Sequence, residues 1–286
     1  GAWPPGQLSP EDERGFRDRI QRYMTKALKE AKSHTSWIDQ NGAYEEAVHA
    51  FIETILDRSS PNPFLDDFLR FQAKIAEYGI YNALAQTLVK ITAPGIPDFY
   101  QGSALWDLRL VDPDNRGAVN YEVRSRLLAD LHARCKGNVV NRKRLVRELI
   151  KTRTDGRIKC YVTATALHYR RVHPSLFLEG DYLPLKGHGR KKDHLCAFAR
   201  VHGEKTVITV VPRFVAGLVS DAKTLPYGKA IWGDTALSLP PGEAVSPYHN
   251  LFTGERVSPI AVKGQPVLLL AQLFDTFPVA LLERVT

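Results

Sequence analysis

The sequence predicts an α+β protein, in which a mainly helical first part precedes an antiparallel β-sandwich. Up to about residue 180, apolar residues recur with a helical period; from about residue 194 they alternate with a period of two. Clusters of turn-forming residues separate the later apolar runs at short intervals, as is typical of a sandwich. We therefore expect a boundary between helical and β structure near residue 180.

Three successive helices are predicted in a helical region spanning residues 1–92. The first, at residues 9–34, begins with Ser9 as a cap, Pro10 at its first position and acidic residues in its first turn. The second is expected at 43–56, and the third, at 64–91, is long and largely apolar on one side, with Gly79 as a site for a kink. Further helical patterns occupy residues 121–136, 142–152 and 157–172.

The last part, residues 181–286, is predicted to form the β-sandwich. Residues 195–214 contain two strand patterns separated by a Gly-containing turn at 201–205, which predicts a hairpin. Further strands are expected at 229–233, 237–239 and 266–274. Because short turn clusters separate these runs, an antiparallel arrangement is the natural interpretation.

Composition excludes several classes of protein. A chain of 286 residues with 44% hydrophobic and 24% charged residues is typical of a globular protein rather than a disordered one. No apolar run approaches the roughly 20 residues of a membrane span, so no membrane partner is expected. The start lacks a secretory pattern, and Cys135, Cys160 and Cys196 lack metal-ligand spacing, which predicts reduced thiols in the cytoplasm and no metal.

The net charge of +8 raises the question of nucleic-acid binding. The excess is concentrated in residues 141–159 and again near Lys191, where basic residues share a helical period with apolar ones instead of alternating with exposed aromatics. This pattern favours a solvated helix face. We therefore expect no nucleic-acid partner, and a steep salt dependence of DNA or RNA binding would contradict this expectation.

Residues 94–102 form a short apolar element between the long third helix and a polar loop. It is too short for a helix, so we predict a buried strand at 96–100. Such a strand between helices suits a parallel barrel or a doubly wound sheet, and it needs neighbouring strands. The first 180 residues contain no other strand candidate, so the sequence predicts that the rest of this sheet lies outside the chain.

The run at residues 91–124, ITAPGIPDFYQGSALWDLRLVDPDNRGAVNYEVR, resembles the last barrel strand and following loop of maltooligosyltrehalose synthases. This family belongs to the α-amylase superfamily and shares the pattern G-x-P-x-x-Y-x-G here. Residues 31–48, 79–95, 173–185, 232–240 and 248–257 are also similar to the family, so the resemblance covers essentially the whole chain. The segments LVDPDNR and HTSW point to the synthase rather than to amylases in general.

The resemblance implies that residues 93–180 contain the last strand and helices of a (β/α)8 barrel. It also implies an enzyme that converts the reducing-end α-1,4 bond of a maltooligosaccharide to an α,α-1,1 bond by intramolecular transglycosylation. This chemistry needs carboxylates that act as nucleophile and as acid and base, and no cofactor. The family's carboxylates lie on earlier barrel strands, and none of their motifs is recognisable here, so we assign no catalytic residue in this chain.

The loop after the last strand is the expected substrate-binding region, because such loops line the active face of a β/α barrel. The candidates are Tyr100, Trp106, Asp112, Asp114, Asn115 and Arg116, whose rings and polar groups suit contact with sugar. An alternative is that the residues around Asp112 form a turn with internal ion pairs and that the aromatic rings only pack beneath it. Two departures from the family affect this loop: Ala104 replaces a common acidic residue, and Gly117-Ala118 replaces Arg-Pro.

A second candidate cluster lies at the junction of the first two helices. His34 and Glu45 are candidates for hydrogen bonds to sugar at the reducing end. The alternative is a capping arrangement, with Ser36 or Asn41 capping the second helix and Trp37 packing into the core. No second ligand lies at metal-binding distance from His34 in the sequence, so no metal is expected there.

A rival hypothesis makes the chain a non-catalytic module that binds glycan through its β domain. Trp232, Tyr227 and Tyr248 would then supply exposed, coplanar rings for stacking on sugar. Their exposure distinguishes this hypothesis from a role in the core.

Overall fold

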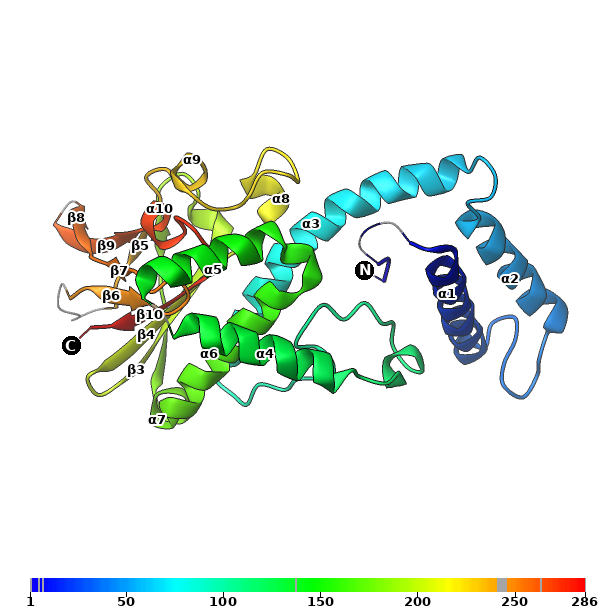
Figure 1. Cartoon of the computed structure of the whole chain (residues 1–286), viewed down its shortest axis with the longest axis horizontal. Coiled ribbons are helices and arrows are strands. Elements are labelled where there is room, and N and C mark those ends of the chain that lie inside the picture. Colours follow the sequence, from blue (N-terminus) through cyan, green and yellow to red (C-terminus); the bar gives the residue numbers. More distant parts are fainter. Residues whose placement is uncertain are drawn as a thin grey trace. The chain divides into compact units, whose positions relative to one another are not determined.

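The computed structural model describes residues 2–4, 6, 8–136, 138–240, 246–262 and 264–285. It divides into two compact units (Figure 1). Unit 1 comprises Gly1–Ala76 and Asp107–Val119, and unit 2 comprises Glu77–Trp106 and Asn120–Thr286. The expected division at residues 92 and 180 stays a prediction.

Unit 1 contains helices α1 (Pro10–Ala31), α2 (Gly42–Leu56) and the first part of α3 (Pro63–Thr92). Ser9 and Asp12 form a reciprocal capping box at the start of α1, and the side chain of Asn41 accepts a hydrogen bond from the Tyr44 N–H at the start of α2. Trp3, Phe16 and Leu65 form a small core. The three predicted helices are thus confirmed, and α3 continues through Gly79.

Unit 2 contains the rest of α3 together with α4 (Tyr121–Cys135), α5 (Val139–Lys151), α6 (Arg157–Val172) and the short α7 (Pro174–Leu178). The predictions of helices at 121–136, 142–152 and 157–172 are confirmed to within a few residues. Asn120 and Asn138 cap α4 and α5 through their side chains, which the sequence pattern did not single out.

Two antiparallel sheets complete unit 2. The six-stranded sheet has the order β1-β3-β4-β10-β6-β7, and the four-stranded sheet has the order β2-β5-β9-β8. The strands are β1 (Asp181–Pro184), β2 (Gly187–His188), β3 (Leu195–His202), β4 (Lys205–Pro212), β5 (Ala236–Ser238), β6 (Tyr248–Asn250), β7 (Arg256–Val257), β8 (Ile260–Val262), β9 (Gln265–Leu269) and β10 (Ala280–Arg284). The predicted hairpin is β3–β4 and the predicted strand at 237–239 is β5, so both are confirmed.

In this region one strand prediction, at 229–233, is wrong, and another, at 266–274, is confirmed only in its first half. Residues 229–233 contain the short helix α9 (Lys229–Trp232), and the predicted strand at 266–274 is β9 followed by helix α10 (Leu270–Leu273). The rings of Trp232, in α9, and Phe274, directly after α10, are both buried and pack at a centroid distance of 5.1 Å. Periodicity cannot distinguish a buried strand from a buried helical turn in runs this short.

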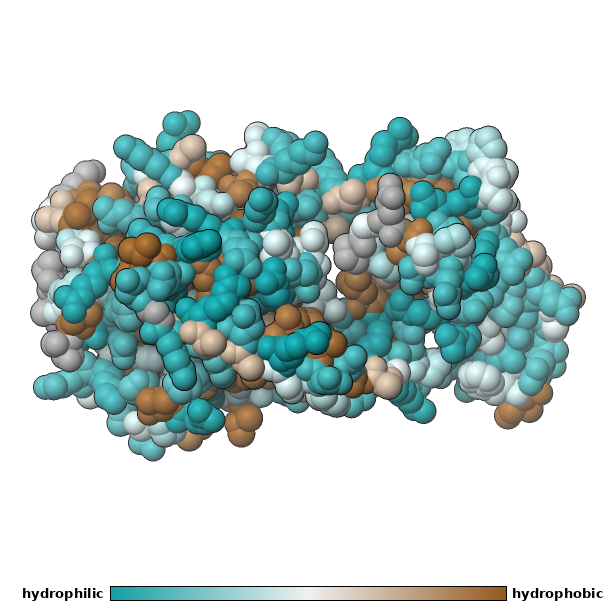
Figure 2. Space-filling model, viewed as in Figure 1, coloured by the Kyte–Doolittle hydropathy of each residue, from teal (hydrophilic) through white to brown (hydrophobic). Residues whose placement is uncertain are grey.

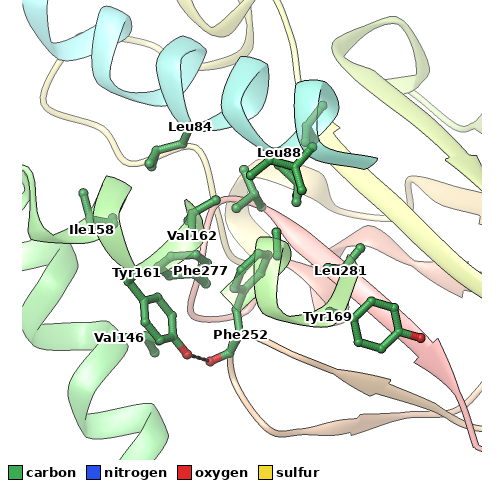
Figure 3. Close-up of a cluster of buried hydrophobic side chains, with 14 of the residues drawn as sticks. Leu84, Leu88, Val146, Ile158, Tyr161, Val162, Tyr169, Phe252, Phe277 and Leu281 are labelled. Carbon is green, nitrogen blue, oxygen red and sulfur yellow. Dashed lines mark hydrogen bonds between the residues drawn. The ribbon is translucent and has the colours of Figure 1, made fainter. Parts of the chain in front are cut away.

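The core of unit 2 lies on both faces of the six-stranded sheet. Val207 and Val211 of β4 face the core that α3, α5 and α6 cover, whereas Ile208 and Val210 face the second core. Figure 3 shows the first of these cores, in which the Tyr161 hydroxyl donates a hydrogen bond of 2.6 Å to the Phe252 carbonyl. The period-two alternation of strand side chains therefore determines which residue enters which core.

The expected strand at 96–100 is absent from the structure. These residues form no strand and pair with no strand among the described parts of the chain, and Ile96 is 88% exposed. The physical reason is that a strand needs a neighbour for its backbone hydrogen bonds, and no such neighbour occurs here. The two sheets of unit 2 are antiparallel, as expected for the β part of the chain. The expected combination of a barrel end with a β-sandwich stays a prediction.

No helix in the described ranges is both long and apolar enough to cross a membrane. Cys135, Cys160 and Cys196 are unpaired thiols. Within the described residues, no group of three or more His, Cys, Asp or Glu side chains could hold a metal ion.

Candidate functional site

The loop Asp107–Val119 of unit 1 is bound to helix α1 through two ion pairs, of which Arg19–Asp114 is the more buried. The Arg19 guanidinium donates two hydrogen bonds to Asp114, from Nε to Oδ1 and from Nη2 to Oδ2, each 2.9 Å long. Its Nη2 also donates a hydrogen bond of 2.8 Å to the Leu108 carbonyl. The Asp114 side chain is only 12% exposed. This bidentate geometry orients the loop on the helix more firmly than a single contact would.

Asp114 is committed to contacts within the chain. Besides Arg19, it accepts a hydrogen bond of 2.6 Å from the Leu110 N–H. The hydrogen bonds from Arg19 are the largest cause that lowers the pKa of Asp114, and the Leu110 N–H adds to the effect. Asp114 is therefore an ionised anchor of the loop, as the turn interpretation expected for an internal ion pair.

Asp112 and Arg116 form the more accessible end of the loop. Lys26 of α1 donates to Asp112 Oδ2 at 2.9 Å, and Asp112 also forms an ion pair with Arg116. The hydrogen bond from Lys26 lowers the pKa of Asp112, with Arg116 contributing. The Arg116 side chain is 73% exposed, so its guanidinium can donate to a bound molecule without leaving Asp112 unpaired.

Asn115 lies in a short 3₁₀ turn, Asp114–Arg116. Its carbonyl accepts a hydrogen bond of 3.2 Å from Arg109, whose guanidinium is also paired with Asp107. The side-chain Oδ1 of Asn115 is buried and has no hydrogen-bond partner among the described residues. An orphaned acceptor of this kind requires an explanation, and a hydroxyl donor from a ligand would satisfy it.

Helix α1 supplies residues of the candidate site that the sequence pattern did not single out. Arg19, Arg22, Lys26 and Lys29 are spaced three or four residues apart, so they form one basic stripe. The sequence alone does not show that the acidic loop folds back onto α1, so it could not pair this stripe with the loop. The helical spacing alone is also typical of a solvated surface.

The second cluster, around His34 and Glu45, is built on the same helix. The Thr35 hydroxyl donates to Glu45 Oε1 at 2.6 Å, and Lys29 Nζ lies 3.2 Å from Glu45 Oε2. The Thr35 hydroxyl is the largest cause that lowers the pKa of Glu45, with Lys29 adding to it. The His34 ring is exposed and packs on Tyr44 at a centroid distance of 5.1 Å.

The capping interpretation of this junction is confirmed in one part and wrong in another. Asn41 does cap α2. Trp37, however, is 55% exposed instead of packing into the core, and Lys29 Nζ lies 5.1 Å from its ring centroid. The buried Thr35 and Lys29 occupy the interior of this junction, so no room remains for the indole.

Tyr100 and Trp106 belong to unit 2. The Trp106 indole N–H donates to the Arg153 carbonyl at 2.8 Å, and Lys159 Nζ lies 5.7 Å from the ring. Trp106 is therefore held by the chain's own residues, whereas the Tyr100 ring is largely exposed.

The rings invoked for a glycan-binding module do not form an exposed platform. Trp232 and Tyr248 are completely buried, and the Trp232 indole N–H donates to the Pro226 carbonyl. Tyr227 is half-buried against the cores. The hypothesis of stacking on these three rings is therefore wrong.

Much of the basic segment at 141–159 is engaged in ion pairs. Glu148 pairs with Arg134 and Arg157, and Lys143 pairs with Glu255. Arg153 pairs with Glu77 of α3 at 2.8 Å. These pairs favour a structural role for the segment, and the absence of a nucleic-acid partner stays a prediction.

Comparison with known proteins bears on the whole chain. No protein-family model matches it. Among solved structures, a maltooligosyltrehalose synthase from Arthrobacter ramosus matches 99% of this chain and 31% of its own, at a TM-score of 0.73 and 28% identity. The DSM5389 glycosyltrehalose synthase matches 94% of this chain and 29% of its own, at a TM-score of 0.64. The fold is thus one found in enzymes of this class.

Curated relatives give the same result. Putative maltooligosyl trehalose synthases from two strains of Mycobacterium tuberculosis are 33% identical over 284 residues, which is 99% of this chain. The chain spans about 30% of the length of these relatives. It therefore corresponds over nearly its whole length to part of a maltooligosyltrehalose synthase, and the resemblance seen in the sequence is confirmed.

Proposed function

We propose that this chain is the C-terminal portion of a maltooligosyltrehalose synthase, the enzyme that turns the reducing end of a maltooligosaccharide into a trehalose unit. The observation that carries the proposal is the match over 99% of the chain to relatives of that name, in sequence and in structure. The proposed reaction breaks one α-1,4 glycosidic bond and forms one α,α-1,1 bond. It involves no net oxidation, so no cofactor is needed.

The catalytic carboxylates are expected in the part of the enzyme outside this chain. A retaining mechanism needs one carboxylate to trap the glycosyl unit covalently and another to protonate, then deprotonate, the exchanged oxygen. The acidic groups of the candidate region are engaged: Asp114 with Arg19, Asp112 with Lys26, and Glu45 with Thr35 and Lys29. We therefore propose that the 286 residues alone do not catalyse the reaction.

The loop Asp107–Val119 is proposed to hold the released glucose before it attacks the covalent intermediate again. Arg116 can donate hydrogen bonds to the glucose and Asp112 can accept them. Asn115 Oδ1, which has no donor among the described residues, can accept one more. Glucose that escapes is replaced by water at the same intermediate, so these contacts would favour rearrangement over hydrolysis. Tyr100 and His34, which are exposed, remain candidates for contact with sugar.

The proposed partner is the remaining part of the same enzyme. Phe64, Phe71 and Ile75 lie on one face of α3 by their spacing, and all three are exposed. Contiguous exposed apolar residues of this size are typical of an interface. Residues 96–100, with exposed Ile96, would supply the barrel strand once neighbouring strands are present. The three unpaired thiols support a cytoplasmic location.

The test is to express the longer polypeptide that carries this chain and to incubate it with maltopentaose. We expect reducing ends to disappear while total glucose stays bound in oligosaccharide, with an NMR signal for the α,α-1,1 linkage. Turnover to maltose and glucose with an increase in reducing ends, one for each bond hydrolysed, would show an amylase instead and would overturn the proposal.

A further inference from the structure

Unit 2 contains an open groove of about 710 Å³ that is separate from every candidate residue discussed above. It lies at β6, β7 and β10 of the six-stranded sheet, close to the start of α5 (Figure 1). Charged and polar side chains dominate its lining, namely His249, Glu255, Arg256, Glu283 and Arg284.

The strand register brings the central groups of the groove together. Glu283 of β10 lies directly opposite His249 of β6, and His249 lies directly opposite Arg256 of β7. Directly opposed residues in an antiparallel sheet project from the same face. The three side chains therefore form one row across three adjacent strands.

Both carboxylates of the groove are already engaged by groups of the chain. Glu255 pairs with Lys143 of α5. Glu283 accepts a hydrogen bond of 3.1 Å from the Tyr169 hydroxyl, and His173 Nε2 lies 3.8 Å from it. Lys205 Nζ in turn lies 3.2 Å from His173 Nδ1. The charge of Glu255 is thus balanced by Lys143, and Glu283 is held by a hydrogen bond from behind the groove.

The cationic side chains leave an excess of positive charge. Arg256 is exposed and has no side-chain partner among the residues that the structure describes. Half-buried His249 has its pKa lowered first by burial and then by Arg142, with Arg256 adding and Glu283 opposing. An anion that enters the groove would be attracted by the unpaired guanidinium and would favour the protonated imidazole.

We propose that this groove is a binding site for a small oxyanion of the phosphate or sulfate type, in which Arg256 binds the anion and His249 donates to it. Planar guanidinium groups bind such anions through two parallel hydrogen bonds. None of the described lining residues is Trp, Tyr or Phe, which disfavours the stacking that a sugar site requires.

The experiment is an NMR titration of the 286-residue chain with sodium sulfate, followed through the His249 ring and assigned with His249→Gln. Sodium chloride at equal ionic strength controls for screening. We expect saturable shifts at millimolar sulfate and a raised pKa of His249, because a nearby anion favours the charged imidazole. Arg256→Ala should weaken sulfate binding at least about tenfold, whereas Arg190→Ala, an equal charge loss at an exposed turn outside the groove, should leave it unchanged.

Several outcomes would overturn the proposal. One such outcome is that sulfate causes chemical-shift changes no larger than those in sodium chloride. Another is that both arginine variants bind sulfate equally weakly. Either result would mean that the groove attracts ions only through its general positive charge. Saturation of the same signals by maltotriose in competition with sulfate would make it a sugar site. Repeating the titration with inorganic phosphate distinguishes a general oxyanion site from a sulfate-selective one. Unchanged backbone spectra of both variants establish that they are folded.

Discussion

Arg19 and Asp114 are 95 residues apart in the sequence, and their ion pair is the more buried of the two that hold the loop on α1. The pair is largely shielded from solvent on both sides. Removing Arg19 would take the hydrogen bond of its Nη2 from the Leu108 carbonyl and leave the Asp114 carboxylate with the Leu110 N–H but no cation. This loss costs more than an exposed pair contributes.

We therefore predict that Arg19→Ala lowers the free energy of unfolding by about 1–3 kcal/mol. Arg70→Ala is the matched control, because Arg70 pairs with Asp67 on a fully accessible face of α3, where such pairs contribute about 0–1 kcal/mol. Urea unfolding of both variants gives the comparison. Equal losses in the two variants would contradict the role of Arg19 as an anchor.

The lowered pKa of Asp114 leads to a prediction about pH. Because its folded pKa lies below the unfolded value of about 3.9, the ionised pair stabilises the folded state at every pH above that value. This stabilisation is lost as the pH falls through the folded pKa. The stability difference between the wild type and Asp114→Asn should thus be full at pH 7 and should shrink below pH 4. A difference that stays constant down to pH 2.5 would mean that the charge of Asp114 is not what matters.

In the complete enzyme, Asp112→Ala or Arg116→Ala should raise the amount of free glucose released per trehalose end formed. The reason is that hydrogen bonds to charged groups are worth about 1.5–3 kcal/mol where they are shielded by bound sugar. A purely structural turn predicts a lower melting temperature with an unchanged product ratio. Measuring both quantities on the same variants separates the two roles.

The loop sequence could suggest Asp112, Asp114, Asn115 and Arg116 as a group, but it could not assign their separate roles. Asp114 differs from Arg116 because it faces α1, and nothing in a segment of seven residues specifies a partner 95 positions away. Exposure and partners, not residue type, decide which of them can reach a ligand.

At the scale of elements, the sequence patterns predicted helices and strands correctly where the pattern extends over many residues. Helices α1 to α6 each carry several turns of apolar spacing, and α1, α2, α4 and α5 also have side-chain caps. The hairpin β3–β4 has two largely apolar strands of eight residues joined by a Gly-containing turn. The predictions failed at α9 and α10, each only four residues long, where tertiary burial of Trp232 and Leu270 determines the conformation. The predicted strand at 96–100 is not formed, because no strand among the described residues lies beside it to accept its backbone hydrogen bonds.

Gly156 lies directly before α6, at a position that should not tolerate a larger residue. Its φ is 83°, and an added Cβ would lie 2.9 Å from the Trp106 backbone nitrogen. Gly156→Ala should therefore destabilise unit 2 by about 1–3 kcal/mol. Gly79→Ala, within α3 and with no atom within 4 Å of the added Cβ, should instead stabilise it by about 0.5–1 kcal/mol. Thermal unfolding of both variants gives the test, and equal effects would contradict it.

At the scale of the whole molecule, the proposed interface leads to a prediction about association. Co-expressed with the remaining part of the enzyme, this chain should co-purify with it. Phe71→Asp should weaken this association, since it places a charge on the exposed apolar face of α3. Val140→Asp, at an exposed apolar residue of α5, serves as control. Equal association of the wild type and Phe71→Asp would place the interface elsewhere.

The face of the molecule drawn in Figure 2 is mainly polar, with apolar residues scattered over it. Unit 2 has its own cores, formed by helices and two antiparallel sheets, and these are filled by residues of this chain. Unit 2 therefore has the properties of a folded unit with a core on each side of its six-stranded sheet.

The most direct measurement is the loss of reducing ends from maltopentaose in three samples: this chain alone, the remaining part alone, and the two co-expressed. Our account predicts no turnover by either part and formation of α,α-1,1-linked ends by the two together, because the catalytic carboxylates and the loop Asp107–Val119 then belong to one enzyme. Appreciable turnover by the 286-residue chain alone would contradict it, since the catalytic carboxylates would then lie within these residues.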